Sequence, residues 1–96
     1  MVIVIAQFPA KPEEGNKLFE AFQQALPDTR RFDGCLGMEF ARELDKPHNF
    51  LLIERWESKE KYDKYLNWRI ETGLLEALGP LMTGQPVISY WIPGGA

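Results

Sequence analysis

The sequence predicts one α+β domain spanning residues 1–96, with a ferredoxin-like β-α-β-β-α-β order and a four-stranded antiparallel sheet. Three observations support this class. Four runs of strand length are rich in aliphatic and aromatic residues, two longer segments space their apolar residues as helices do, and a turn-rich segment between the second and third runs suits a hairpin. Hydrophobic residues make up 45% of the chain and charged residues 26%, as in an ordinary globular domain.

The opening third of the chain predicts a strand followed by a helix. Val2–Phe8 is apolar almost throughout, which favours a central strand covered on both faces, and Pro9 ends it. A helix is predicted to begin near Pro12, because an apolar stripe with helical spacing follows: Leu18, Phe22, Ala25 and Leu26. Pro27 either ends or kinks this helix, or opens a short continuation through Asp28 to Phe32; the sequence leaves both alternatives open.

The next segment predicts an antiparallel hairpin. Asp33-Gly34 signals a turn before a strand over Cys35–Glu43. Leu44–Asn49 contains Asp, Pro, His and Asn, and is the predicted loop to a third strand, Phe50–Trp56. Alternation along the second strand predicts that one set of side chains shares a face: Leu36, Met38, Phe40 and Arg42.

The last third predicts a divided helix and a final strand. Ser58 is a candidate N-cap for a second helix, and residues 71–73 interrupt its pattern. A helical stripe resumes at Leu74 and ends at Gly79-Pro80, so the helix is expected to be kinked or in two pieces. Val87–Ile92 is the predicted fourth strand.

The predicted strands are apolar on both sides, whereas two helices cover only one face of a sheet. We therefore expect the other face to pack against a second copy, giving a homodimer that forms a dimeric α/β barrel.

Composition excludes several classes of function. The net charge is −3 and the basic residues are scattered, so no nucleic acid partner is expected. The longest apolar run, Met1–Ala6, is too short to cross a membrane, and the N-terminus lacks the features of a signal peptide; the expected location is cytoplasmic. One cysteine, Cys35, and one histidine, His48, do not compose a metal site or a catalytic pair.

Three short motifs distributed along the chain resemble the antibiotic biosynthesis monooxygenase family, a group of dimeric α/β-barrel proteins. They are Gly15 near the start of the first helix, the turn Phe32-Asp33-Gly34-Cys35, and Glu54-Arg55-Trp56-Glu57-Ser58 leading into the second helix. The resemblance implies a pocket between sheet and helices that binds an electron-rich polycyclic phenol or quinol. It further implies that the substrate reacts with molecular oxygen without metal or flavin, hence without a cofactor.

The candidate catalytic residues are Trp56, Tyr62 and Glu54. Trp56 matches the family's strand-end tryptophan, and Tyr62 matches a tyrosine of the members that oxidise aromatic polyketides. Glu54 shares a strand face with apolar neighbours, where desolvation raises the pKa of a carboxyl toward that of a usable base. Two departures weaken the match: Leu52 stands where those members carry asparagine, and Tyr65 stands where many members carry histidine.

The candidate substrate-binding residues are Tyr65, Trp68, Arg69, Leu52 and Phe22. Haem degradation, which uses the same fold, is disfavoured because residues 72–76 contain no axial histidine.

Plainer explanations remain for each candidate. Trp56 also suits a core tryptophan, Glu54 also suits an ion pair with Arg69 or a bond to a tyrosine, and both tyrosines also suit core packing. The leading prediction is a cofactor-independent monooxygenase acting on a small aromatic molecule. The alternative is a non-catalytic module that binds a small aromatic ligand, or a stress-related dimer.

Overall fold

The computed structural model describes residues 1–95 and confirms the predicted α+β fold. The elements, in chain order, are strand β1 (Val2–Pro9), a 3-10 turn η1 (Pro12–Glu14), helix α1 (Gly15–Arg31), strands β2 (Cys35–Arg42) and β3 (Asn49–Trp56), helices α2 (Lys59–Glu71) and α3 (Leu74–Leu78), a second 3-10 turn η2 (Gly79–Leu81), and strand β4 (Val87–Trp91).

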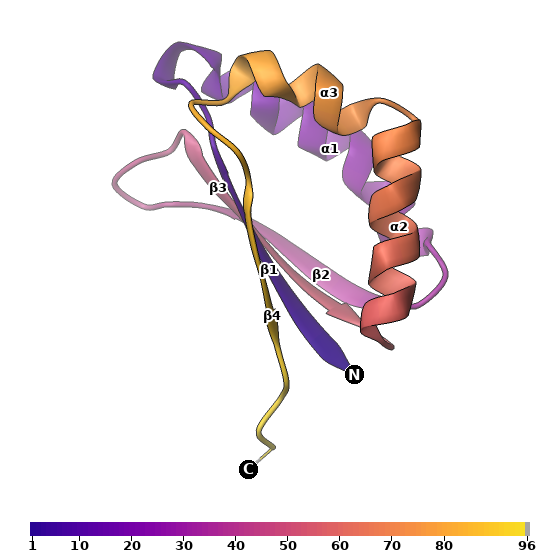
Figure 1. The fold of residues 1–96 in the computed structure, drawn as a ribbon. Helices are drawn as coiled ribbons and strands as arrows, with labels where there is room; N and C mark the ends of the chain where they lie inside the picture. The colour runs from indigo at the N-terminus through magenta and orange to yellow at the C-terminus, as the bar shows by residue number, and fades with distance from the viewer. Residues whose placement is uncertain (96) are drawn as a thin grey trace.

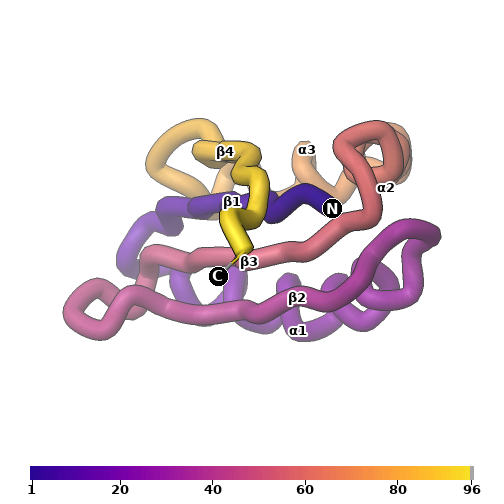
Figure 2. Tube along the Cα trace, turned by 90° about the horizontal axis from the view of Figure 1, so that it is seen from below, coloured from indigo at the N-terminus to yellow at the C-terminus, as the bar shows by residue number. Residues whose placement is uncertain are grey.

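The four strands form one antiparallel sheet in the order β2-β3-β1-β4, the arrangement of a split βαβ unit. Figure 2 shows the two central strands of the sheet, β1 and β3, between β4 and β2. All three helices lie on one side of the sheet, and the other side is uncovered (Figure 1). The functional candidates on β3, which are Leu52, Glu54 and Trp56, are buried on the helix-covered face.

Strand β2 departs from the predicted alternation. The pairing with β3 shifts between Cys35 and Gly37, so Cys35 lies opposite Trp56 while Met38 lies opposite Glu54. This bulge inserts one residue, and Leu36 leaves the helix-covered face and is 55% exposed. The prediction that Leu36 shares a face with Met38 and Phe40 is wrong for this reason.

Helix α1 continues past Pro27 as far as Arg31, which decides the alternative that the sequence left open. A proline inside a helix lacks the N–H that would bond to the carbonyl four residues earlier. Here that carbonyl belongs to Gln23, an exposed residue on the solvent side. The continuation places Thr29, which is fully buried, against helix α2.

The second helical segment is in two pieces, as predicted. The Ser58 hydroxyl accepts a hydrogen bond from the Lys61 backbone N–H at 3.2 Å and caps the start of α2. The break before α3 lies at Gly73, whose φ of 86° is a left-handed conformation that favours glycine. The chain turns there, and α3 runs in a different direction from α2 on the same side of the sheet (Figure 1).

The core lies between the sheet and the helices. Val4, Leu52 and Trp56 from the central strands are buried on this side, with Leu18 and Phe22 from α1. On the open face the central strands carry four half-buried aliphatic side chains, and β4 adds an exposed valine and an exposed tryptophan: Ile3, Ile5, Leu51, Ile53, Val87 and Trp91.

Both termini lie at the same end of the sheet, where the residues after β4 extend past it (Figure 1). Strand β4 ends at Trp91, one residue short of the predicted boundary. Within residues 1–95, no helix combines the length and apolar character needed to cross a bilayer.

Candidate functional site

A small cavity of about 40 Å³ lies between the sheet and the helices. Five of the eight predicted site residues line it: Phe22, Leu52, Tyr62, Tyr65 and Arg69. The remaining walls are almost entirely apolar and come from every layer around it: Phe8, Ala25, Leu26, Leu66, Leu74, Leu75, Leu78, Pro86 and Ile88. This volume holds a few water molecules, whereas pockets for small molecules span roughly 300–1,000 Å³.

Trp56 and Glu54 lie beside this cavity rather than in its wall. Trp56 is fully buried, and its ring packs against Tyr62 and Tyr65 with centroid distances of 5.6 and 5.1 Å. Its indole N–H donates a 2.9 Å hydrogen bond to a Glu54 carboxyl oxygen. The expected partner of Glu54 was an arginine or a tyrosine, but its carboxyl accepts this bond from the Trp56 indole instead. The pair fixes the tryptophan ring behind the two tyrosines.

Burial raises the pKa of Glu54 above its ordinary value, and the Trp56 hydrogen bond and the Arg69 charge oppose that rise only in part. The predicted direction of the shift is therefore confirmed. Its carboxyl, however, faces the indole N–H and not the cavity wall. The geometry suits a group that orients Trp56 better than one that touches a substrate.

Tyr62 is a buried residue whose hydroxyl makes no hydrogen bond within residues 1–95. The residue is 2% exposed and lines the cavity. Burial raises the pKa of Tyr62 strongly, and the nearby Glu54 carboxyl adds to the rise. Tyr62 therefore stays a neutral phenol and a hydrogen-bond donor at neutral pH.

Tyr65, Thr29 and Arg69 form a buried hydrogen-bond network that ties α2 to α1. The Tyr65 and Thr29 oxygens lie 2.6 Å apart, and Arg69 Nε donates to the Tyr65 hydroxyl at 2.9 Å. Arg69 Nη2 donates to Thr29 Oγ1 at 3.0 Å and to the Ala25 carbonyl at 2.6 Å. Burial raises the pKa of Tyr65, while its bonds to Thr29 and Arg69 act against that rise.

Trp68 is half-buried and does not line the cavity. The Arg69 guanidinium lies 4.6 Å from the centre of its ring, so Trp68 acts on the site through Arg69. Cys35 is half-buried, and burial raises the pKa of its thiol, which makes it a weak nucleophile. Among residues 1–95, no cluster of His, Cys, Asp and Glu has the arrangement of a metal site.

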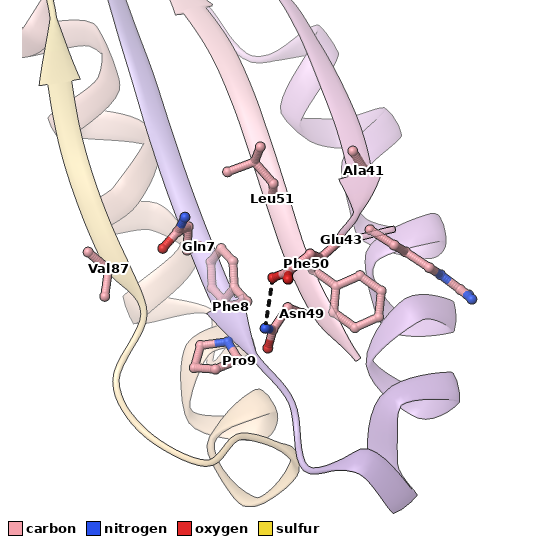
Figure 3. A pocket seen from close by; sticks show the side chains of 10 residues that line it. Gln7, Phe8, Pro9, Ala41, Glu43, Asn49, Phe50, Leu51 and Val87 are labelled. Carbon is pink, nitrogen blue, oxygen red and sulfur yellow. Dashed lines mark hydrogen bonds between the residues drawn. The ribbon is translucent and has the colours of Figure 1, made fainter. Parts of the chain in front are cut away.

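A larger concavity lies elsewhere, on the open face of the sheet. It is a groove of about 410 Å³ near the hairpin, bordered by Gln7, Leu51 and Val87 (Figure 3). At one side Asn49 donates a 3.1 Å hydrogen bond to Glu43. None of the predicted site residues lines this groove. It belongs to the surface that we expect a second copy to cover.

Two parts of the site were not among the predicted residues. Thr29 continues the stripe of Leu18, Phe22 and Leu26 at helical spacing, so treating Pro27 as tolerated would have found it. The α3 leucines form a helical stripe in the sequence, but nothing in that pattern shows that they close the cavity.

The fold and the site together define a ferredoxin-like α+β protein with a small, largely apolar cavity under its helices. A family model described as antibiotic biosynthesis monooxygenase matches residues 1–68. The chain belongs to this family. The matched segment includes Trp56, Tyr62 and Tyr65, and ends before Arg69, α3 and β4.

Solved structures agree with this assignment. A proposed antibiotic biosynthesis monooxygenase from Deinococcus radiodurans is 27% identical, with a TM-score of 0.88 over 100% of this chain and 95% of that one. Rv0793 from Mycobacterium tuberculosis is 26% identical, with a TM-score of 0.79 over 99% and 96%. PA3566 from Pseudomonas aeruginosa, 18% identical with a TM-score of 0.87 over 98% and 94%, shares the fold. None of the curated proteins matches this chain.

Proposed function

We propose that the protein is a cofactor-independent monooxygenase that oxidises a quinol or phenol with molecular oxygen in the cavity beside Trp56. The observation that carries the proposal is the position of Tyr62, a side chain with no hydrogen bond from its hydroxyl within residues 1–95, at a cavity that five predicted site residues line. A phenol hydroxyl that no protein group binds is available to donate to a ligand oxygen or to water.

The roles of the site residues follow from their positions. Tyr62 donates a hydrogen bond to a substrate oxygen, and this bond strengthens as negative charge develops on that oxygen. Phe22 and Leu52 enclose the ring of the substrate. Trp56 holds both tyrosines in place from behind, and Glu54 fixes the orientation of Trp56.

The proposed reaction balances without an external reductant. One atom of O₂ enters the substrate as a carbonyl oxygen and the other leaves as water. The two hydrogens and the electrons come from the substrate: from one C–H and one O–H bond of a phenol or quinol, or from the two C–H bonds of a CH₂ carbon in an anthrone or tetracenone. The protein's contribution is to exclude bulk water, hold the ring, and stabilise the oxyanion.

The test is oxygen-dependent turnover by protein freed of metal ions and flavin. A panel of a hydroquinone, an anthrone and a tetracenone is incubated under air and under argon, and products are identified by mass spectrometry. Conversion under air alone supports the proposal. We would abandon it if no member of the panel is converted.

A second candidate function rests on the volume of the cavity. About 40 Å³ is far below the size of an ordinary ligand pocket, which favours a structural protein whose pocket is filled by its own side chains. Absence of binding by every aromatic compound of the panel would support this function. Saturable quenching of tryptophan fluorescence by an aromatic compound that is recovered unchanged would instead support a non-catalytic binding function over the enzyme.

We also propose that the protein is a homodimer whose open sheet faces meet. The support is the group of aliphatic side chains on that face, including Ile3, Ile5 and Ile53. In a single copy of the chain these side chains face water. An apolar sheet face of this kind commonly marks a protein interface. Light scattering that gives the mass of one 11.1 kDa chain at micromolar concentration would refute this.

A further inference from the structure

A second concavity adjoins the cavity between the sheet and the helices. This space, the α3 groove, has a volume of about 300 Å³. It is lined by Leu75 and Glu76 of α3, by Gly79, and by residues 82–86, which lead into β4. Leu75 and Pro86 also line the cavity, so these two side chains stand between the cavity and the groove.

The cavity alone has too little room for an aromatic ring. Its volume is about 40 Å³, whereas a protein cavity that binds benzene measures roughly 150 Å³. The α3 groove, at about 300 Å³, reaches the lower limit of small-molecule pockets, which is roughly 300 Å³. A ring that binds beside Trp56 therefore needs space that the adjoining groove can supply.

Leu75 is the boundary side chain that can move. The ring of Pro86 is fixed to its own backbone, and on the same wall the Thr83 N–H donates to the Pro9 carbonyl at 2.9 Å, which ties this wall to β1. Leu75 is half-buried on α3, a five-residue helix that follows the left-handed Gly73. A helix this short depends on side-chain packing for its stability. Rotation of Leu75 toward water therefore costs only part of the burial of one leucine.

We propose that Leu75 controls entry to the site: a ligand arrives through the α3 groove, displaces the Leu75 side chain, and binds with its ring in the cavity and a polar end in the groove. The lining sets this orientation, because the cavity is walled chiefly by apolar side chains while Glu76, Thr83 and Gln85 line the groove. The groove has an acidic side chain and, among residues 1–95, no basic one, so the polar end is uncharged. The ligand class is an elongated aromatic molecule with an uncharged polar end.

The inference deepens the proposed function and rests on it for the reaction at the inner end, whereas the test measures binding alone. The probe is Prodan, a neutral naphthalene with a ketone at one end, whose emission shifts to the blue in an apolar site. Stopped-flow fluorescence gives its association and dissociation rates. We expect the unmodified protein to bind Prodan, and Leu75→Ala to bind it about five- to tenfold more tightly through faster association, because no half-buried leucine must be displaced.

Leu74→Ala is the matched control. Leu74 is also half-buried on α3 and lines the cavity, but it does not line the groove. Its truncation enlarges the cavity and leaves the boundary in place, so the association rate should stay within about twofold of that of the unmodified protein. Leu75→Phe makes the boundary larger and should slow association; this variant keeps an apolar side chain and decides the matter if Leu75→Ala does not fold.

Nuclear Overhauser contacts of bound Prodan test the orientation. Contacts from the naphthalene ring to the Leu52 methyl groups, together with contacts from the propionyl group to the Thr83 methyl group, are expected. Absence of Prodan binding by every variant, association rates that do not respond to Leu75→Ala or Leu75→Phe, equal acceleration by Leu74→Ala, or contacts of the ring to Thr83 alone would each overturn the inference.

The outcome is separable from that of the proposed function. Oxygen-dependent turnover of the quinol panel, with Prodan association unaffected by residue 75, would refute the inference and leave the monooxygenase proposal in place. Prodan binding controlled by Leu75, without turnover of any member of the panel, would uphold the inference and refute the monooxygenase.

Discussion

Replacing Glu54 by glutamine tests how the protein holds Trp56. Glutamine keeps a side-chain oxygen that accepts the 2.9 Å hydrogen bond from the indole, and it removes the ionisable group. Since Glu54 is 2% exposed, the change also removes the cost of ionising a buried carboxyl. We expect Glu54→Gln to be at least as stable as the unmodified protein at pH 7.

The difference in free energy of unfolding between Glu54→Gln and the unmodified protein depends on pH in a defined direction. The folded-state pKa of Glu54 is raised above its ordinary value of 4.5, so the folded state holds the proton more tightly than the unfolded state does. The stability that Glu54 contributes is therefore present below pH 4.5 and is lost as pH rises toward the folded-state pKa. The free energy of unfolding of the variant relative to the unmodified protein should rise by at most about 1.36 kcal/mol per pH unit across that window.

Urea unfolding between about pH 4 and pH 8 measures this difference, because the other groups titrate equally in both proteins. Glu20→Gln provides the matched control, since Glu20 is exposed on α1, and its difference from the unmodified protein should stay flat. A flat difference for Glu54→Gln as well would refute a raised pKa of the Glu54 carboxyl beside Trp56.

Three further predictions test the frame around the site. Ser58→Ala removes the cap of α2 and should lower the free energy of unfolding by about 1 kcal/mol in urea titrations; no change would show that the cap is dispensable. Gly34→Ala should destabilise by about 1–3 kcal/mol, because φ at Gly34 is 94° and an added Cβ would lie 2.6 Å from Lys61 Cβ; thermal unfolding checks this, and an unchanged midpoint would contradict it. Ile53→Lys places a charge on the open sheet face and should convert the expected dimer to monomer by light scattering, whereas a persistent dimer would place the interface elsewhere.

The sequence was sufficient for the topology, because periodicity and turn residues mark each element independently. The four strands, the Ser58 cap and the break near residue 73 each carry a local signal. Leu36 was misplaced because alternation is counted residue by residue, and a bulge adds one residue without changing the pattern elsewhere. The extent of α1 beyond Pro27 depended on tertiary contacts, chiefly the burial of Thr29 against Tyr65.

The candidate site was only partly predictable for a similar reason. Facing residues on β3 and α2 share a face by periodicity, which brought Leu52, Tyr62, Tyr65 and Arg69 to one cavity. The hydrogen-bond partner of Glu54 was not predictable. The Trp56 indole, two residues further along β3, competes for the carboxyl with groups on other elements, and the sequence does not rank them. The size of the cavity depends on the side chains of α3, and sequence spacing gives no information on that packing.

The most direct test of the central claim is oxygen uptake by Tyr62→Phe compared with Tyr90→Phe. Tyr62 lines the cavity, whereas Tyr90 is 42% exposed and packs on the outer side of Tyr62 with a centroid distance of 5.9 Å. With the best quinol of the panel, removal of the Tyr62 hydroxyl should lower kcat by about 10²–10³-fold, as for other oxyanion donors, and Tyr90→Phe should retain the activity. Equal oxygen uptake by Tyr62→Phe and the unmodified protein would contradict the claim that the cavity beside Trp56 is the site of oxidation.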